Sequence, residues 1–436
     1  MPKKCVLILL DGIGDRSYVQ LDHQTPLQAA KTPVLDELAE RGANGLYHAA
    51  LLGQALPSEI AHFLMFGYEM SQFPGRGVLE ALGAGIDLSP KDVAVLSHFA
   101  CLQESDGCLI VKQRKPEISK DELSRLIHAV GEFEAKGVRL RFIQTGGIFG
   151  IIRLSGDVSP YITDTDPFMD GFPLIGIDPW RDYSEDVIVR NTASILREYL
   201  IWAYGQLKEH PVNQSRISKG QESINGFVTQ RAGQLKNVMP FEHFYGLRGI
   251  SIASGIVYWG LSSYLGIDSE RVVDSSDPEN DIAERLNIAY RALKKYDFVH
   301  VHTKAPDEAA HTKDPQFKKE IVESLDKGIG KAIRPLMEDP DVLLIVTADH
   351  STPSSGPLIH SGETVPLTFF GRGIRRDRVS RFDEVSVSPG ALGSVRGKEL
   401  MYLILNHLDR SKLRGIMDTP VDQPYWPGDY EPFRLK

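Results

Sequence analysis

One serine stands between a short turn and an apolar segment in GQALPSEIAHFLMFGY, residues 53–68. A serine at the first turn of a helix commonly caps it, because the hydroxyl satisfies a free backbone N–H. A capping box would need Glu or Gln three residues later, but that position is Ala61 and the acid is Glu59. Ser58 is therefore either a plain N-cap or a nucleophile held at the positive end of a helix.

Aspartate and histidine side chains recur where strands are expected to end, the edge at which open α/β sheets form their sites. They are Asp11, Asp307, His311, Asp349, His350 and His360. Asp307 and His311 are four residues apart, so on a helix they share a face and can bind one ion together.

Each of these segments has a simpler explanation when taken alone. An Asp-Gly after a strand is usually a turn, and an Asp and a His four residues apart are often a surface pair. Together with Ser58, however, three Asp and three His at strand ends suit two adjacent divalent ions. Coordination would activate the serine hydroxyl, and the second ion would hold the oxygens of a phosphoryl group for in-line attack.

Alternating strands and helices must position these residues. Apolar runs at 5–10, 296–302, 342–350 and 366–371 predict buried strands, and residues 316–333 predict a helix. Another helix is predicted with Thr32 as N-cap, Pro33 at its first position and Gly42 just past its end. This alternation predicts an α/β fold with a mostly parallel sheet.

The middle of the chain has a different character. Residues 117–144 predict a helix and then a strand, and the polar stretch 208–227 predicts little regular structure. We expect a discontinuous core of residues 1–87 and 237–436, with residues 88–236 inserted as a smaller α/β or α+β domain.

Composition excludes several classes of protein. The 436 residues suggest two to three domains, with 42% hydrophobic and 25% charged residues. A net charge of −9 argues against a general nucleic-acid binder. The three cysteines contain no CxxC and indicate a reducing compartment.

No segment predicts export or membrane insertion. The first apolar run ends at Asp11 after six residues, too short for a signal peptide. No window approaches the roughly 18 apolar residues of a membrane span. We therefore expect a soluble, cytoplasmic protein without a nucleic-acid or membrane partner.

Motifs spread over nearly the whole chain resemble those of a known family. They are LDGIGDR, TPLQAAKTPVLDELAERGANGL, PSEIAHFLMFGY, GRGVLEALGAG, ITDTDP, YGLRG, KAPDEAAH, TADHSTP and HSGETVPL. The chain resembles the archaeal-type 2,3-bisphosphoglycerate-independent phosphoglycerate mutases of the alkaline phosphatase superfamily. The resemblance implies an alkaline-phosphatase-like core, with helices on both faces of the sheet.

The resemblance also assigns roles to the clustered residues. Ser58 looks like the nucleophile that becomes phosphoserine, and it would also contact metal. One ion would be held by Asp307, His311 and His360, and the other by Asp11, Asp349 and His350. Mn²⁺, Zn²⁺, Co²⁺ or Mg²⁺ is implied, and the mixed Asp/His set favours Mn²⁺ or Zn²⁺.

The chain departs from the family pattern in two places. LPSE at 56–59 stands where Pro-Gly-Ser-Asp is usual, and SHFA at 97–100 stands where Arg-x-Asn-Phe is expected. A His-Arg pair expected before the next strand is replaced by GGIFGIIRL. The metal core thus looks complete, whereas the grip on the substrate looks altered.

Arginine offers a planar fork suited to phosphate and carboxylate, although each arginine could equally be a solvated surface charge. The candidate anion contacts are Arg114, Arg153, Arg231, Arg248 and Lys304. Asp164 and Asp166 would orient arginines or accept glycerate hydroxyls. His62, one helical turn after Ser58, is either a neighbour of the site or a packed histidine.

The leading hypothesis is a mutase that interconverts 3-phosphoglycerate and 2-phosphoglycerate through phosphoserine, with the glycerate retained by the inserted domain. A metal-dependent phosphomonoester or phosphonate hydrolase is the alternative, because the same core would release phosphate if the glycerate escaped. A non-catalytic binding protein is a third, but none of the seven key residues is missing. No motif indicates an oligomeric state.

Overall fold

Contacts divide the computed structural model, which describes residues 1–435, into two compact units. The first comprises Met1–Phe73 and the chain from Val238 onward, and the second is Pro74–Asn237. The second unit begins before the expected residue 88, because helix α4 (Arg76–Gly83) packs on strands β3 and β8 of that unit.

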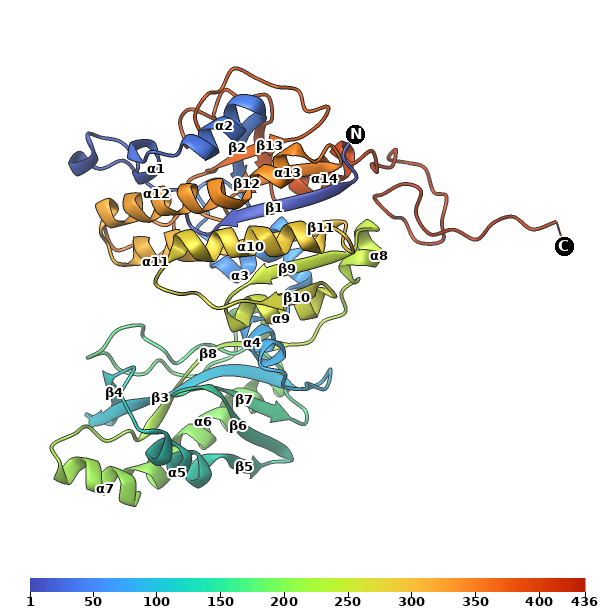
Figure 1. Cartoon of the computed structure of the whole chain (residues 1–436). Coiled ribbons are helices and arrows are strands. Elements are labelled where there is room, and N and C mark those ends of the chain that lie inside the picture. The colour runs from blue at the N-terminus through green and yellow to red at the C-terminus, as the bar shows by residue number, and fades with distance from the viewer. Residues whose placement is uncertain (436) are drawn as a thin grey trace. The chain divides into compact units, whose positions relative to one another are not determined.

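The first unit is built on an eight-stranded sheet with the order β10-β9-β11-β1-β12-β13-β2-β14 (Figure 1). Its strands are β1 (Lys4–Leu10), β2 (Ala43–His48), β9 (Gly249–Ala253), β10 (Asp268–Arg271), β11 (Phe298–Thr303), β12 (Val342–Thr347), β13 (Val365–Phe370) and β14 (Gly393–Arg396). Every pairing is parallel except those of β13 with β12 and β2. The predicted α/β fold with a mostly parallel sheet is confirmed.

Strand β1 fixes where the chemistry can lie. Its residues from Cys5 to Leu10 are completely buried between two parallel neighbours, as a continuous apolar run requires. Leu10 pairs with Thr303 of β11, and Leu9 pairs with Thr347 of β12. The three carboxyl ends therefore meet at one edge of the sheet.

Helices cover the first unit's sheet, and α12 packs against both α10 and α11 (Figure 1). The helices are α1 (Pro26–Ala29), α2 (Pro33–Arg41), α3 (Ser58–Met65), α8 (Phe241–Tyr245), α9 (Ile256–Leu265), α10 (Pro278–Ala292), α11 (Ala305–His311), α12 (Pro315–Ala332), α13 (Arg334–Glu338) and α14 (Glu399–His407), with 3-10 turns at Val19–Leu21 and Met70–Gln72. No helix among residues 1–435 is long and apolar enough to span a membrane.

The second unit is an antiparallel sheet covered by helices, and is α+β. Strands run in the order β4-β3-β7-β6-β5, with β8 also paired to β3. They are β3 (Val93–Ser105), β4 (Cys108–Gln113), β5 (Glu132–Ala135), β6 (Val138–Gly146), β7 (Phe149–Ser155) and β8 (Gly226–Gln234). The helices besides α4 are α5 (Lys120–Val130), α6 (Val187–Lys208) and α7 (Pro211–Ser218), with a 3-10 turn at Arg181–Tyr183.

The polar stretch 208–227 was wrongly predicted to lack regular structure, because it contains α7. This helix buries Val212, Asn213 and Arg216, so only one of its three buried residues is apolar. The Asn213 amide donates to the carbonyls of Leu207 and Ile224, at 2.8 and 2.9 Å. Hydrogen bonds to neighbouring segments of the same chain stabilise this helix, and the local sequence pattern does not indicate them.

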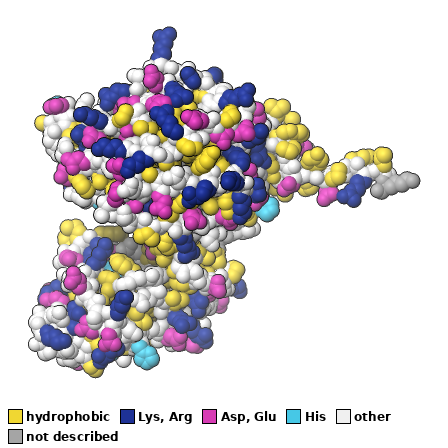
Figure 2. All heavy atoms as spheres, viewed as in Figure 1, with side chains coloured by type: hydrophobic (Ala, Val, Ile, Leu, Met, Phe, Trp, Pro, Cys, Tyr) yellow, Lys and Arg dark blue, Asp and Glu magenta, His cyan; other side chains and the backbone are white. Residues whose placement is uncertain are grey.

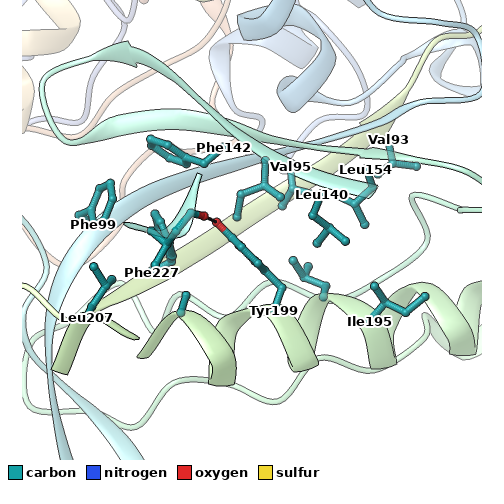
Figure 3. Packing of buried hydrophobic residues seen from close by; sticks show 14 of the residues in the cluster. Val93, Val95, Phe99, Leu140, Phe142, Leu154, Ile195, Tyr199, Leu207 and Phe227 are labelled. Carbon is teal, nitrogen blue, oxygen red and sulfur yellow. Dashed lines mark hydrogen bonds between the residues drawn. The ribbon is translucent and has the colours of Figure 1, made fainter. Parts of the chain in front are cut away.

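The core of the second unit surrounds Tyr199 of α6 (Figure 3). Its ring packs among Phe133, Trp202 and Phe227, and its hydroxyl donates to the Val130 carbonyl at 2.9 Å.

On the face shown in Figure 2, basic and acidic side chains are interspersed without a continuous basic stripe, unlike a typical nucleic-acid-binding surface.

Helix α2 begins at Pro33 and ends before Gly42 as predicted, but the Thr32 side chain does not cap it. Asp326 of α12 does so instead, because its carboxylate accepts the Leu35 N–H at 2.8 Å and the Val34 N–H at 3.1 Å. Burial nevertheless raises the pKa of Asp326 to about 6, since it outweighs these hydrogen bonds.

We expect Asp326→Asn to stabilise the first unit at pH 8 but not at pH 4. The folded protein holds the Asp326 proton up to about pH 6, whereas the unfolded chain loses it near pH 4. Between these values the wild type loses stability relative to the variant, by about 3 kcal/mol at the plateau. Denaturant unfolding across pH 4–8 measures the difference. The exposed Glu320→Gln on the same helix is the control, and an equal pH profile for it would contradict the assignment.

Candidate active site

Ser58 is the first residue of α3 and does not cap it, because the N-cap position is Pro57. The Ser58 Oγ lies 2.8 Å from Nε2 of His350 instead. The serine hydroxyl therefore points at a ligand-bearing loop rather than at its own helix. Of the two roles that the sequence left open, the geometry excludes the N-cap.

Asp11, Asp349 and His350 form one buried group of potential ligands at the carboxyl edge of the sheet. The Nε2 atom of His350 is 3.3 Å from Oδ1 of Asp11 and 3.2 Å from Oδ2 of Asp349. Both carboxylate oxygens are buried without a hydrogen-bond partner. Unsatisfied oxygens facing a ring nitrogen are what a cation would complete.

Asp307, His350 and His360 form a second group, which shares His350 with the first. His360 Nε2 is 3.5 Å from Oδ1 of Asp307, and the rings of His350 and His360 stack with centroids 3.8 Å apart. His360 donates Nδ1–H to the Leu56 carbonyl at 2.7 Å, which leaves Nε2 facing Asp307.

His311 lies beside the second group but outside it. Its Nε2 is 3.3 Å from Oδ2 of Asp307, and 38% of its side chain is exposed. The i, i+4 spacing does bring the pair together on α11, as predicted. The sequence predicted Asp307, His311 and His360 as the ligands of one ion. In the structure, His350 rather than His311 completes the close group with Asp307 and His360.

The cluster brings three buried carboxylates close together, and burial disfavours their ionised forms. Burial, reinforced by Asp349 and Asp307, raises the pKa of Asp11 well above its ordinary value. Burial also raises the pKa of Asp349 to about 7. Burial likewise opposes ionisation of Asp307, but hydrogen bonds from His311 and His360 outweigh it and lower the pKa. Divalent cations fit this donor set, since they would balance the buried carboxylates.

A fully buried lysine ties the loops of the cluster together. Lys318 Nζ donates to the carbonyls of Gly14 and Thr352, at 3.0 and 2.9 Å, and to Oδ2 of Asp15 at 3.1 Å. Asp15 also accepts the backbone N–H of Ser354 at 3.2 Å. The loop after β1, which carries Asp11, is thereby joined to the loop after β12, which carries Asp349.

The second unit contains a cavity of about 220 Å³ with basic residues in its wall. Its lining includes Arg76, Ser97, His98, Arg114, Lys115, Gln230 and Arg231. Arg114 Nε donates to Oδ1 of Asp166 at 2.9 Å and a second guanidinium nitrogen reaches Oδ2, so the fork is held in place. His98 Nε2 and Ser97 Oγ are buried without a partner.

Arg231 has a positive φ of 50°, an unfavourable conformation for a residue with a side chain. It lies at a bulge, because Leu96 and Ala94 of β3 pair with Gln230 and Gly233 of β8. Asp164 accepts the Arg231 N–H at 2.6 Å and holds this backbone. Asp166 thus contacts the guanidinium of Arg114, whereas Asp164 contacts the backbone of Arg231, and the roles of the two carboxylates in substrate binding stay predictions.

The three other predicted anion contacts do not line this cavity. Arg153 of β7 is outside the cavity lining and donates to the Asp87 carbonyl at 3.3 Å. Arg248 precedes β9, at the edge opposite the cluster, and lies 3.6 Å from Asp297. We therefore include neither in the proposed site. Lys304 follows β11 at the correct edge, with its ammonium 5.6 Å from the ring centroid of Tyr258.

Sequence reasoning missed two residues that contact Asp11. Tyr258 of α9 and His302 of β11 both reach its Oδ2, at 2.9 and 3.0 Å. A polar residue within a strand-like or helical apolar segment gives only a weak signal. His62, by contrast, was considered, and its fully buried Nδ1 is 2.9 Å from the Ser58 carbonyl oxygen.

Comparison with known proteins decides the family. A family model described as the metalloenzyme superfamily matches residues 3–407. The chain is 37% identical, over 98% of both chains, to "2,3-bisphosphoglycerate-independent phosphoglycerate mutase 2" of Methanocaldococcus jannaschii. It is 35% identical to the mutase of Methanopyrus kandleri, over 94% of this chain and 97% of the relative. The chain belongs to the 2,3-bisphosphoglycerate-independent phosphoglycerate mutases. The family resemblance inferred from the motifs is confirmed.

Two solved structures share the fold of this chain. The PH0037 protein from Pyrococcus horikoshii has a TM-score of 0.77 and 28% identity, covering 95% of this chain and all of that one. The cofactor-independent phosphoglycerate mutase from Thermoplasma acidophilum has a TM-score of 0.65 and 28% identity, covering 93% of this chain and all of that one. The relatives thus share both units of this mutase.

We expect Lys318→Met to destabilise the protein by about 3–5 kcal/mol, because it leaves Asp15 buried and uncompensated. Metal binding should weaken as well, since the two ligand loops lose their common anchor. Denaturant unfolding and metal titration measure the two effects. The neighbouring Lys319→Met removes only a surface pair with Glu323 and should cost less than about 1 kcal/mol. Equal effects of the two substitutions would show that the buried pair has no special role.

Proposed function

We propose that this protein interconverts 3-phosphoglycerate and 2-phosphoglycerate through a phosphoserine on Ser58, without added bisphosphoglycerate. The observation that carries the proposal is the Ser58 hydroxyl, 2.8 Å from His350 inside the Asp/His cluster. Membership of the mutase family supports the same activity. A cytoplasmic location remains a prediction from the sequence.

Two divalent ions are assigned to the cluster. Asp307, His311 and His360 are proposed for one, and Asp11, Asp349 and His350 for the other, beside Ser58. The mixed nitrogen and oxygen donors favour Mn²⁺ or Zn²⁺ over Mg²⁺. Bound ions would lower the pKa of the serine hydroxyl and stabilise the charge of the phosphoryl group in transfer.

The reaction consists of two transfers of one phosphoryl group. Ser58 Oγ loses its proton and bonds to phosphorus, while the bond from phosphorus to O3 of the glycerate breaks and O3 takes up a proton. The glycerate then turns, and its O2 hydroxyl loses its proton and bonds to phosphorus, while the Oγ–phosphorus bond breaks and Oγ takes up a proton. The position of Ser58 at the start of α3 places it at the positive end of the helix.

Retention of the glycerate separates a mutase from a hydrolase. We assign the carboxylate grip to Arg114 and Arg231 of the second unit, which line one cavity. Asp166 fixes the Arg114 fork, and Asp164 fixes the backbone of Arg231. Because Asp166 occupies the Nε edge of the Arg114 guanidinium, the remaining N–H groups of Arg114 and the guanidinium of Arg231 are assigned to the glycerate carboxylate.

A hydrolase is the second candidate, and SHFA at 97–100 is the feature that favours it. This segment lacks the arginine expected there by family resemblance. The cavity wall nevertheless contains Arg114, Lys115 and Arg231, which supply positive charge from other strands and loops. The mutase is therefore preferred.

We expect Ser58→Ala to abolish turnover and to leave metal binding largely intact, because only the nucleophilic oxygen is removed. Phosphorus NMR on Mn²⁺-loaded protein with 3-phosphoglycerate should give a 2-phosphoglycerate signal for the wild type and no new signal for the variant. Elemental analysis should find about two ions per chain in both.

Two results would count against this assignment. Appreciable 2-phosphoglycerate formation by Ser58→Ala would remove the serine from its role. Free phosphate as the main product of the wild type would identify a hydrolase. The two results are independent of each other, because the first concerns the nucleophile and the second concerns the fate of the glycerate.

We expect Arg114→Ala to lower kcat/KM about 10- to 100-fold, the size of a lost charged hydrogen bond. The fraction of phosphate released should also rise, since the carboxylate is held less firmly. Arg153→Ala is the control, because that guanidinium lies outside the cavity lining. If Arg153→Ala has the larger effect, the cavity is not the glycerate grip.

A further inference from the structure

Two buried donors converge on one oxygen of Asp11. The Tyr258 hydroxyl donates to Oδ2 at 2.9 Å, and His302 Nε2 lies 3.0 Å from the same atom. The other oxygen, Oδ1, is buried without a hydrogen-bond partner and faces His350 Nε2 at 3.3 Å. The two oxygens of one carboxylate therefore have different surroundings.

Both donors are buried, because Tyr258 is 2% exposed and His302 is fully buried. A carboxylate oxygen accepts hydrogen bonds, so the contacts with Oδ2 of Asp11 direct the Tyr258 O–H at this atom and assign a ring proton of His302 to Nε2.

The two donors come from different elements and pack against each other. Tyr258 is near the start of α9, which follows β9, and His302 is near the carboxyl end of β11. Their ring centroids are 4.2 Å apart, and the ring of His62 lies 4.8 Å from Tyr258 and 5.1 Å from His302. The aromatic contacts restrict both donors to one orientation.

We propose that Tyr258 and His302 are positioning residues that clamp Oδ2 of Asp11 and thereby reserve Oδ1 for the metal held with Asp349 and His350. The inference rests on the proposed function, because that function assigns Asp11 to a metal. Hydrogen-bonding partners of this kind orient a ligand, and their loss typically weakens metal binding 10- to 100-fold. The clamp acts on one of the two ion positions, since neither residue contacts Asp307 or His360 among the described hydrogen bonds.

A merely structural role makes a different prediction. If Tyr258 and His302 only fill space, their removal should lower stability and affect both ions alike. A positioning role should affect the ion at Asp11 selectively, even in protein whose metal-free stability is unchanged. The number of ions bound and their separate affinities distinguish the two.

The test compares Tyr258→Phe with Tyr264→Phe. Tyr264 lies on the same helix, and its hydroxyl donates to the Gln72 carbonyl at 2.9 Å, away from Asp11. Full-length protein is stripped with a chelator and titrated with Mn²⁺, and free Mn²⁺ is followed by electron paramagnetic resonance. We expect Tyr258→Phe to weaken one of two sites about 10- to 100-fold and to leave the other unchanged.

Two variants of His302 provide the second part of the test. His302→Gln keeps an N–H donor and should retain more affinity than His302→Leu, which removes it. Thermal unfolding of the metal-free variants reports any general loss of structure. Selective weakening in Tyr258→Phe, with partial rescue by His302→Gln, supports the clamp.

Two outcomes overturn the proposal. One is unchanged affinity at both sites in Tyr258→Phe, and the other is an equal loss at both sites or in Tyr264→Phe. No phosphoglycerate is present in the titration, so its result is independent of turnover. A wild type that binds two ions but forms no 2-phosphoglycerate would refute the proposed function and leave the clamp standing.

Discussion

Three buried carboxylates that meet at one edge of the sheet impose the condition on which the rest of the active site depends. Asp11, Asp307 and Asp349 are all nearly or completely buried, and burial, reinforced by repulsion from the other two carboxylates, raises the pKa of Asp11. Such charges are costly unless positive charge or hydrogen bonds compensate them. The protein compensates part of the cost itself, through His311 and His360 on Asp307, and leaves one oxygen each of Asp11 and Asp349 unsatisfied.

The sheet makes this concentration of charge possible. Because β11, β1 and β12 are parallel neighbours, three loops from distant parts of the sequence begin at the same edge. Parallel strands alone would leave those loops free to separate. Lys318 prevents this, since its three hydrogen bonds join the loop after β1 to the loop after β12. A buried ion pair of this kind is weak evidence for net stability, but its rupture is costly.

The second unit also uses a buried carboxylate to hold a charged residue in place. Its cavity combines a guanidinium held by a buried carboxylate with an arginine at a strained bulge. Backbone strain of about 1–3 kcal/mol is tolerated where the surroundings fix the conformation, and such positions cluster at functional sites. The altered segment SHFA lies in the same wall, with Ser97 and His98 presenting unpartnered polar atoms. The positive charge that the family resemblance predicts on β3 is absent, but Arg114 and Arg231 supply positive charge to the same cavity from other elements.

The sequence by itself determined the fold class, the family and the ligand types. Long apolar runs and well-punctuated helices are local signals, so β1, α2 and α12 could be predicted from their own residues. Spacing within one element also sufficed for Asp307 and His311, which share one face of a helix. Helix α7 escaped prediction because two of its three buried residues are polar and their hydrogen-bond partners lie in other segments.

Only the tertiary structure decided how those residues act on one another. Ser58 could be a cap until its hydroxyl was found against His350, 292 positions later in the chain. Tyr258 and His302 gave no motif, because their role is defined by one oxygen of Asp11, which is distant in sequence. Arg248 matched a family motif, yet it lies at the amino end of β9, opposite the cluster. Strand order and direction fix such positions, and they depend on long-range pairing that no local segment encodes.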